Sequence, residues 1–306
     1  ATNALVDICL EKGLRAVVGK VCMDRHGGDG YEETTADALA GTRACLDYIR
    51  KAQPGASGLA RLVQPCVIPR FIPTCTPELL AGLGAIARES DDVWVQSHAS
   101  EAPDQVKFVD TLHPGKRCTE IFESHGLLTD KCVMAHCVYL EDGELDTFAR
   151  KGAGVACCPL SNAIFSLSPG WHAFPFHKAH AKGVRVGMGT DIAGGYAASI
   201  LVACRHAAVA SKHDMDAKDV DYKDAFWAAT LGGARALGLD TVLGNFEVGK
   251  QFDAVRINCE AGNYDTFPSA IHPCCPSRLE HDFEKFVNLG DDRNIASVYV
   301  QGKRRR

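Results

Sequence analysis

The sequence contains no uninterrupted apolar run of roughly 18 residues or more, so it predicts no membrane-spanning helix. It also has no excess of basic residues: 33 Lys and Arg stand against 38 Asp and Glu, and the net charge is −5. A chain with this charge lacks the positive field that attracts nucleic acid or an anionic membrane surface. We therefore expect neither nucleic acid nor a membrane among its partners.

Motifs of several common enzyme classes are absent as well. The 14 cysteines include no Cys-x-x-Cys pair, which argues against a zinc finger and against the cysteine-bound zinc of cytidine-type deaminases. Neither a Gly-x-Ser-x-Gly motif nor a phosphate-binding glycine loop occurs, so a serine hydrolase and a nucleotide-phosphate site are not indicated. The cysteines are scattered and often lie in apolar segments, which indicates reduced, buried thiols in a cytoplasmic protein.

What the sequence does contain is a regular alternation of short apolar segments and segments with helical periodicity. The 306 residues are 46% hydrophobic, enough for one large domain and a small appendage. We predict strands over 15–22, 62–68, 93–97, 132–136, 153–157 and 184–188. We predict helices over 35–50, 76–87, 103–112, 118–124, 142–150, 174–182, 197–211 and 223–237. Such alternation is typical of a parallel α/β sheet covered by helices, in either a doubly wound sheet or a barrel.

The pattern changes after Gly238. Residues 244–257 predict a β-hairpin, residues 297–303 predict one more strand, and the stretch between them is irregular. We therefore expect a barrel unit over residues 1–238 and a small β domain over residues 239–306.

Three predicted strands lead into side chains that bind metals. His98 and His136 end two of them, and Asp191 follows a third within a glycine-rich segment. Histidine and aspartate at the C-terminal ends of different strands are typical of a zinc site at the rim of a (β/α)8 barrel, which favours the barrel over the doubly wound sheet. A barrel has eight strands and only six are predicted, so we expect these to be strands three to eight.

Other polar residues lie close to the same strand ends. Glu101 follows His98 by three positions, and a carboxylate beside zinc can move protons to and from the water that zinc acidifies. Arg70 ends a further strand and can donate two hydrogen bonds to a substrate carbonyl or carboxylate, while Phe71 can pack on a flat ring. A surface ion pair and a core phenylalanine explain this pair equally well.

The remaining candidates are interpreted as structural. Ser161 and Asn162 follow another strand, and turn chemistry explains them better than a place in a pocket. Several further histidines lie in polar or loop-like contexts without the strand-end pattern, and we interpret them as ordinary core or surface residues: His26, His113, His125, His213 and His281.

Seven segments together resemble the amidohydrolase superfamily and, within it, the guanine deaminases. The likeness covers residues 13–303. The motif Gly-Thr-Asp is shared by many amidohydrolases, whereas guanine deaminases are set apart by the combination of Pro-Arg-Phe and Gln-Ser-His-x-Ser-Glu. The segments are Pro69–Phe71, Val95–Glu101, Val133–His136, Cys158–Asn162, Gly189–Gly195, Ala229–Ala234 and Leu289–Asn294.

The resemblance implies zinc-dependent hydrolysis of guanine to xanthine and ammonia, with one zinc ion per subunit of a homodimer. It implies that His98 and Asp191 bind the zinc and that Asp191 also takes a proton from the attacking water. Glu101 would relay protons between that water and the purine ring nitrogen, and His136 would orient the nucleophile and stabilise its charge.

The same resemblance implies that Arg70 recognises the purine carbonyl and that Phe71 shapes the ring pocket. The sequence departs from the family in three ways: it contains no His-x-His pair, which supplies two further zinc ligands, and it carries Cys137 and Cys157 where glycine and histidine are usual. We expect the missing pair to lie upstream of Ala1. Two alternatives stay open: an amidohydrolase acting on an adenosine-like or triazine-like ring, and a catalytically inactive fragment.

Overall fold

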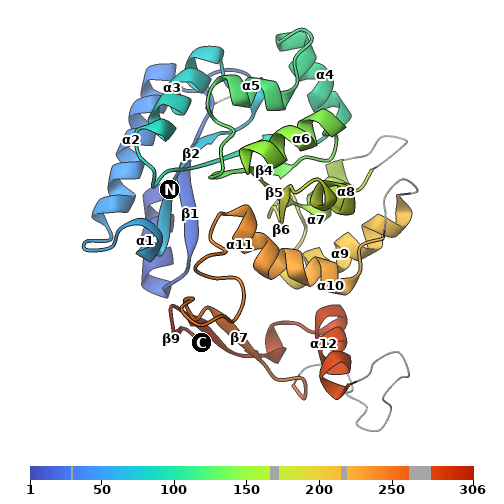
Figure 1. Ribbon diagram of the computed structural model, residues 1–306. Coiled ribbons are helices and arrows are strands. Elements are labelled where there is room, and N and C mark those ends of the chain that lie inside the picture. The colour runs from blue at the N-terminus through green and yellow to red at the C-terminus, as the bar shows by residue number, and fades with distance from the viewer. Residues whose placement is uncertain (29, 166–171, 215–218, 262–276) are drawn as a thin grey trace.

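Six parallel strands form the central sheet of the computed structural model, which describes residues 1–28, 30–165, 172–214, 219–261 and 277–306 (Figure 1). Within these residues the strand order follows the chain, so each strand pairs with the next one. The predicted α/β class and all six predicted strands are confirmed. The strands are β1 (Ala16–Cys22), β2 (Val63–Pro69), β3 (Trp94–Ala99), β4 (Cys132–His136), β5 (Gly154–Cys157) and β6 (Arg185–Met188).

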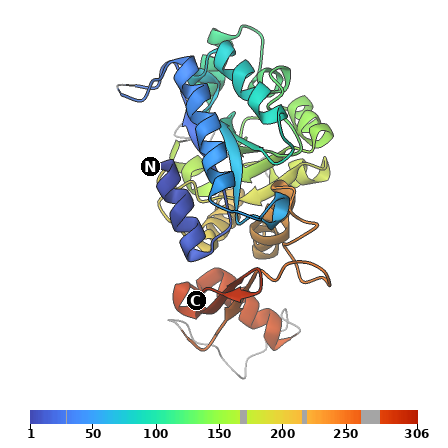
Figure 2. The same cartoon turned by 90° about the vertical axis from the view of Figure 1, so that its left-hand side faces the viewer.

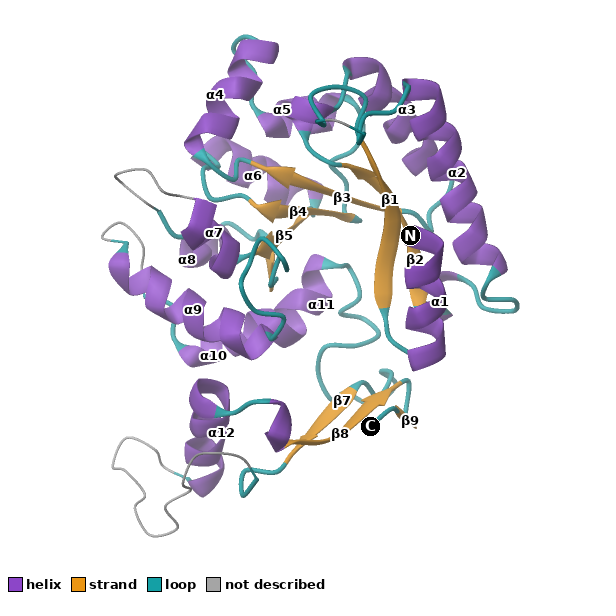
Figure 3. Cartoon of the chain, turned by 180° about the vertical axis from the view of Figure 1, so that it is seen from behind, coloured by secondary structure: helices purple, strands orange, loops and turns teal. Residues whose placement is uncertain are grey.

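Helices lie around the outside of these strands (Figure 3). They are α1 (Thr2–Lys12), α2 (Thr35–Lys51), α3 (Pro77–Arg88), α4 (Pro103–Leu112), α5 (Cys118–Ser124), α6 (Asp142–Lys151), α7 (Pro159–Phe165), α8 (Phe176–Ala181), α9 (Ile200–His213), α10 (Tyr222–Trp227) and α11 (Gly233–Ala236). A π-helical turn, Ala228–Gly232, joins the last two, so the predicted helix over 223–237 is three short consecutive pieces. Helices α1 and α7 were not predicted.

Side-chain chemistry explains where several helices begin. The Thr34 hydroxyl accepts a hydrogen bond from the Asp37 backbone N–H, and Thr76 does the same for Leu79. Both satisfy N–H groups that lack a partner in the first helical turn. Pro77 then occupies the first position of α3, where the missing N–H costs nothing.

The main core lies between the sheet and the surrounding helices. Strand β2 is buried along nearly its whole length, as expected for a parallel strand covered on both faces. Leu79, Leu80 and Leu83 of α3 are fully buried in the same core, and each such leucine contributes roughly 1.5–3 kcal/mol relative to an exposed position. A slip of one residue would turn these buried faces outward, so packing fixes the register.

The sheet is open in the described part of the chain, because β1 and β6 are not hydrogen-bonded to each other. A closed barrel is therefore not seen. All six strands run in the same direction, however, and their C-terminal ends meet at one rim. No helix among the described residues is long and apolar enough to cross a bilayer.

A second sheet lies below the first in Figures 1 and 2. It is antiparallel and consists of β7 (Ala254–Ile257), β8 (Ile295–Val300) and β9 (Lys303–Arg304), with α12 (Arg278–Leu289) beside it. Arg15, just before β1, donates to Asp253 at 2.5 and 3.1 Å and so ties the two sheets together. The division at residue 238 into two domains stays a prediction.

The predicted hairpin over 244–257 is wrong. Only the last four residues form a strand, and that strand pairs with β8 rather than with the preceding segment. Polar side chains in 244–253 bond locally instead: Lys250 donates to Asn245 at 2.6 Å, and Asn245 donates to Glu247 at 2.7 Å. The stretch expected to be irregular contains α12, while its residues 262–276, including all three prolines, lie outside the described residues.

Candidate metal centre and active-site cleft

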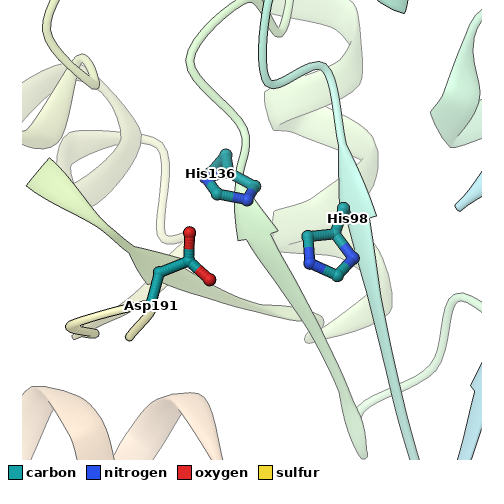
Figure 4. Close-up of side chains that lie close together, drawn as sticks. All are labelled: His98, His136 and Asp191. Carbon is teal, nitrogen blue, oxygen red and sulfur yellow. The ribbon is translucent and has the colours of Figure 1, made fainter. Parts of the chain in front are cut away.

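The ends of three strands bring two imidazoles and one carboxylate together. His98 is the second-to-last residue of β3, His136 ends β4, and Asp191 follows β6 by three residues. One ligand atom of each lies within 4.8 Å of the others, and Figure 4 shows the Asp191 carboxylate facing both rings. The convergence follows from the topology, because parallel strands deliver their C-terminal residues to the same rim.

His98 is oriented by the backbone of the neighbouring strand. Its Nδ1 lies 2.7 Å from the carbonyl oxygen of Arg70. A carbonyl can only accept, so Nδ1 carries the proton and Nε2 keeps its lone pair. This is the arrangement in which a histidine binds a metal through Nε2.

His136 is fully buried and is held by a side chain instead. Its Nδ1 donates to Oδ1 of Asn162 at 2.8 Å, and its ring stacks on that of His98 with centroids 5.3 Å apart. Nε2 has no hydrogen-bond partner and lies 3.5 Å from Oε1 of Glu101. Burial lowers the pKa of both histidines, so both rings are neutral near pH 7, which is the form that binds metals.

Asp191 lies in a turn that its glycines make possible. Its own φ is 49°, in the left-handed region, and its carbonyl accepts the Gly195 N–H at 2.6 Å. A Cβ at Gly194 would lie 2.6 Å from Oδ2 of Asp191, so a side chain at that position would displace the carboxylate. Ser100 and His136 also have positive φ values, and such backbone strain tends to collect at functional sites.

Glu101 forms part of the wall beside this cluster. Burial raises the pKa of its carboxyl group above the ordinary value, with the nearby His98 acting in the opposite direction. The Glu101 backbone N–H donates to Oε1 of Gln105 at 2.6 Å, which ties the strand end to the first turn of α4. A carboxyl group with a raised pKa can take up and release protons closer to neutral pH.

The cluster opens into a cleft with a volume of about 620 Å³. Arg70 and Phe71 lie in its wall, and the guanidinium carbon of Arg70 is 5.4 Å from the centroid of the Phe71 ring. The cleft is lined by His26, Arg70, Phe71, Pro73, Thr74, His98, Glu101, Ala102, Asp104, Gln105, Phe108, His136, Phe165, Asp191 and Gly194. The six residues selected from the sequence are all among them.

Three residues of this site were missed or misjudged from the sequence. Asn162 is 2% exposed and bonds His136, so its interpretation as a turn residue was wrong. His26 lines the cleft, where its Nδ1 donates to the Pro73 carbonyl at 3.0 Å. It follows β1 by four residues, and this position after a strand end is the signal that could have identified it. For Gln105 no comparable signal exists.

The two unusual cysteines do not border the cleft as the structure describes it. Cys137 is fully buried, and its thiol points toward the carbonyl oxygens of Met134 and Ala135, at 3.7 Å from each. Cys157 is buried as well, and burial raises the pKa of its thiol. Neither side chain crowds the metal-binding cluster.

The donor set fits a zinc ion. Two neutral imidazoles and one carboxylate are ligands that zinc prefers, and the unpartnered Nε2 of buried His136 is a polar atom that lacks a partner in the protein. Such a cluster at the C-terminal rim of a parallel α/β sheet is typical of metal-dependent hydrolases.

The Amidohydrolase family model matches residues 1–305, and the chain belongs to this family. It is 41% identical to the guanine deaminase of Homo sapiens, over 98% of this chain and 64% of that protein. The structure of E. coli guanine deaminase superimposes with a TM-score of 0.85 at 31% identity, covering 99% of this chain and 66% of that one. The guanine deaminase of C. acetobutylicum, solved with bound guanine, gives a TM-score of 0.81 at 29% identity over 99% and 68%. The resemblance to guanine deaminases is thus confirmed, and the chain spans slightly less than two thirds of the length of the human relative.

Proposed function

We propose that the protein hydrolyses guanine to xanthine and ammonia with one zinc ion. One juxtaposition carries the proposal: a cluster of His98, buried His136 and Asp191 lies in the same cleft as Glu101 and Arg70. Relatives named guanine deaminase, one of them solved with guanine, support the choice of substrate.

His98 and Asp191 would hold the zinc, through Nε2 and a carboxylate oxygen. The ion supplies Lewis acidity, which lowers the pKa of a water molecule and makes it a nucleophile near neutral pH. The protein's part is to keep both ligands in place, through the Arg70 carbonyl for His98 and through the glycine turn for Asp191.

The other groups would move protons and hold charge. Water adds to the ring carbon that carries the amino group, and Asp191 takes a proton from it. Glu101 passes its proton to the ring nitrogen and regains one from the added hydroxyl as the carbonyl forms. Asp191 gives its proton to the amino group, the C–N bond breaks, and ammonia leaves. His136, 3.5 Å from Glu101, orients the attacking water by accepting a hydrogen bond at Nε2, and it stabilises the charge that develops on the water oxygen once a proton has moved to Nε2.

Substrate recognition falls to the wall formed by β2 and the residues after it. The Arg70 guanidinium can donate two hydrogen bonds to the purine carbonyl, and the face of Phe71 can pack on the flat ring. Both residues border the cleft, whose volume of about 620 Å³ leaves room for a purine.

Three broader features belong to the same proposal. The six strands correspond to strands three to eight of an eight-stranded barrel, as their order and their shared rim suggest. The protein works as a homodimer with one zinc ion per subunit. It acts in the cytoplasm, which is consistent with its many unpaired, buried cysteines.

Ammonia release from guanine tests the proposal, using the protein as encoded by its gene. The substitution Glu101→Gln keeps the shape of the side chain and removes its proton transfer, so kcat should fall roughly 100- to 10,000-fold with zinc still bound. The matched control Glu78→Gln alters an exposed carboxylate in the first turn of α3 and should keep full activity. Unchanged turnover in the first variant would rule out the proton relay.

Two further measurements separate the alternatives. Turnover of an adenosine-like or triazine-like ring in preference to guanine would assign a different amidohydrolase activity. Zinc analysis of residues 1–306 tests the inactive-fragment interpretation, because a fragment that lacks ligands should lose the ion on dialysis. About one tightly held zinc per chain would exclude it.

A further inference from the structure

Among the described residues of the cluster, His136 is the one ring whose orientation is set by a side chain, that of Asn162, and not by the main chain. Nδ1 of His136 lies 2.8 Å from Oδ1 of Asn162, whereas the corresponding atom of His98 bonds the Arg70 carbonyl. Both residues of the first pair are buried, at 0% and 2% exposure, so no bulk water can replace the amide.

We propose that Asn162 is a positioning residue that fixes the tautomer and the rotation of the His136 ring. Its amide oxygen requires a proton on Nδ1, which leaves the lone pair on Nε2. That nitrogen is buried without a partner and lies 3.5 Å from Glu101, within the cluster of metal-binding groups. The opposite tautomer would place a proton on Nε2, directed at the space where a cation would bind.

The backbone of Asn162 is held in the first turn of α7. Its backbone N–H donates to the Cys158 carbonyl at 3.0 Å, and the hydroxyl of the preceding Ser161 donates to the same oxygen at 3.2 Å. Cys158 directly follows β5, the strand that pairs with β4. A residue that follows β5 therefore orients a catalytic group at the end of β4, and the parallel register between the two strands fixes their distance.

Two substitutions separate the acceptor from the bulk of the side chain. Asn162→Leu keeps a similar shape and removes the acceptor, while Asn162→Asp keeps an acceptor oxygen. The matched control is Ser161→Ala, which changes a fully buried neighbour on the same helix whose hydroxyl bonds the Cys158 carbonyl.

The first readout is independent of activity. In protein labelled with ¹⁵N-histidine, free of metal and at alkaline pH, the nitrogen chemical shifts show which atom of neutral His136 carries the proton. We expect Nδ1–H in the wild type, in Asn162→Asp and in Ser161→Ala, and loss of this preference in Asn162→Leu. A wild-type ring protonated on Nε2 would overturn the inference. An unchanged tautomer in Asn162→Leu would overturn it too. If that variant does not fold, the wild-type spectrum alone still tests whether Nδ1 carries the proton.

The second readout rests on the proposed function. In zinc-loaded protein, loss of a residue that orients a catalytic ring typically costs roughly 10- to 100-fold, so kcat for guanine should fall by this factor in Asn162→Leu. KM should stay nearly constant because Arg70 and Phe71 are untouched, and Asn162→Asp should recover activity. Equal loss in both variants would assign Asn162 a purely structural role. Absence of guanine turnover in the wild type would reject the proposed function and leave the tautomer result standing.

Discussion

The carbonyl oxygen of Arg70 accepts the Nδ1–H of His98 at 2.7 Å, so a residue whose side chain lines the cleft also orients a ring of the candidate metal cluster. The two tasks fall on different atoms. The backbone of Arg70 holds His98 and, at 3.1 Å, the hydroxyl of Ser97, while its guanidinium lies over Phe71 in the cleft. Substitution of the side chain should therefore separate substrate binding from metal binding.

Arg70→Ala tests this separation. Loss of a charged hydrogen-bond donor to the substrate should raise KM for guanine at least about tenfold, while the zinc content stays at the wild-type level because the carbonyl remains. Arg70→Lys should recover little, since an ammonium cannot offer two parallel donors. Zinc lost together with substrate affinity would show that the side chain also supports His98.

Gly194→Ala tests the fit of the turn that presents Asp191. The new methyl group would lie 2.6 Å from Oδ2, closer than real Cβ contacts allow, so the carboxylate must move. We expect loss of zinc affinity and of guanine turnover, with circular dichroism unchanged. The control is the same change at Gly143, in the first turn of α6, where a Cβ meets nothing within 4 Å. There alanine should preserve activity and stabilise slightly.

The strands and the convergence of three side chains at one rim were predictable from the sequence for one physical reason. A strand buried on both faces is a short apolar run, and parallel strands bring their ends to one rim, so His98, His136 and Asp191 had to lie near one another. Helix α1, one of the helices that were not predicted, lacks such signals. Ala1 gives α1 no side-chain cap, and Leu5 and Ile8 remain half exposed, which blurs its apolar face.

The contacts around the cluster were not predictable in the same way. Asn162 meets His136 across 26 residues of chain, and Gln105 meets the Glu101 backbone only because α4 begins at Pro103. Such contacts depend on helix starts and side-chain rotamers that hydrophobic periodicity does not encode. The false hairpin over 244–257 shows the opposite error, in which polar residues that bond locally imitate a turn between strands.

His98→Ala tests the metal site directly. Removal of one ligand should lower zinc affinity by at least about tenfold, measured by competition with a chelator. Chelation of the wild-type protein should abolish guanine turnover, and added zinc should restore it. His113→Ala is the matched control, since that ring lies outside the cluster and contacts Arg25 at 3.5 Å. Equal zinc affinity in all three proteins would place the ion elsewhere.

Asp92 provides a prediction about stability and pH away from the cleft. Its carboxylate accepts from Arg50 at 2.7 Å and from Arg61 at 2.5 Å, and the hydrogen bond to Arg50 holds the pKa of Asp92 well below its ordinary value of 3.8. A lowered pKa in the folded state stabilises the protein above pH 3.8, and this contribution fades as pH falls further toward the folded-state pKa. Asp92→Asn should therefore lower the free energy of unfolding by about 1–3 kcal/mol at neutral pH, measured by urea denaturation, and the difference from the wild type should shrink below pH 3.8. Glu89→Gln is the control, because its pair with Arg43 is half exposed on both sides and should contribute nothing measurable. A difference between Asp92→Asn and wild type that stays constant with pH would show that packing of Asp92, and not its charge, stabilises the fold.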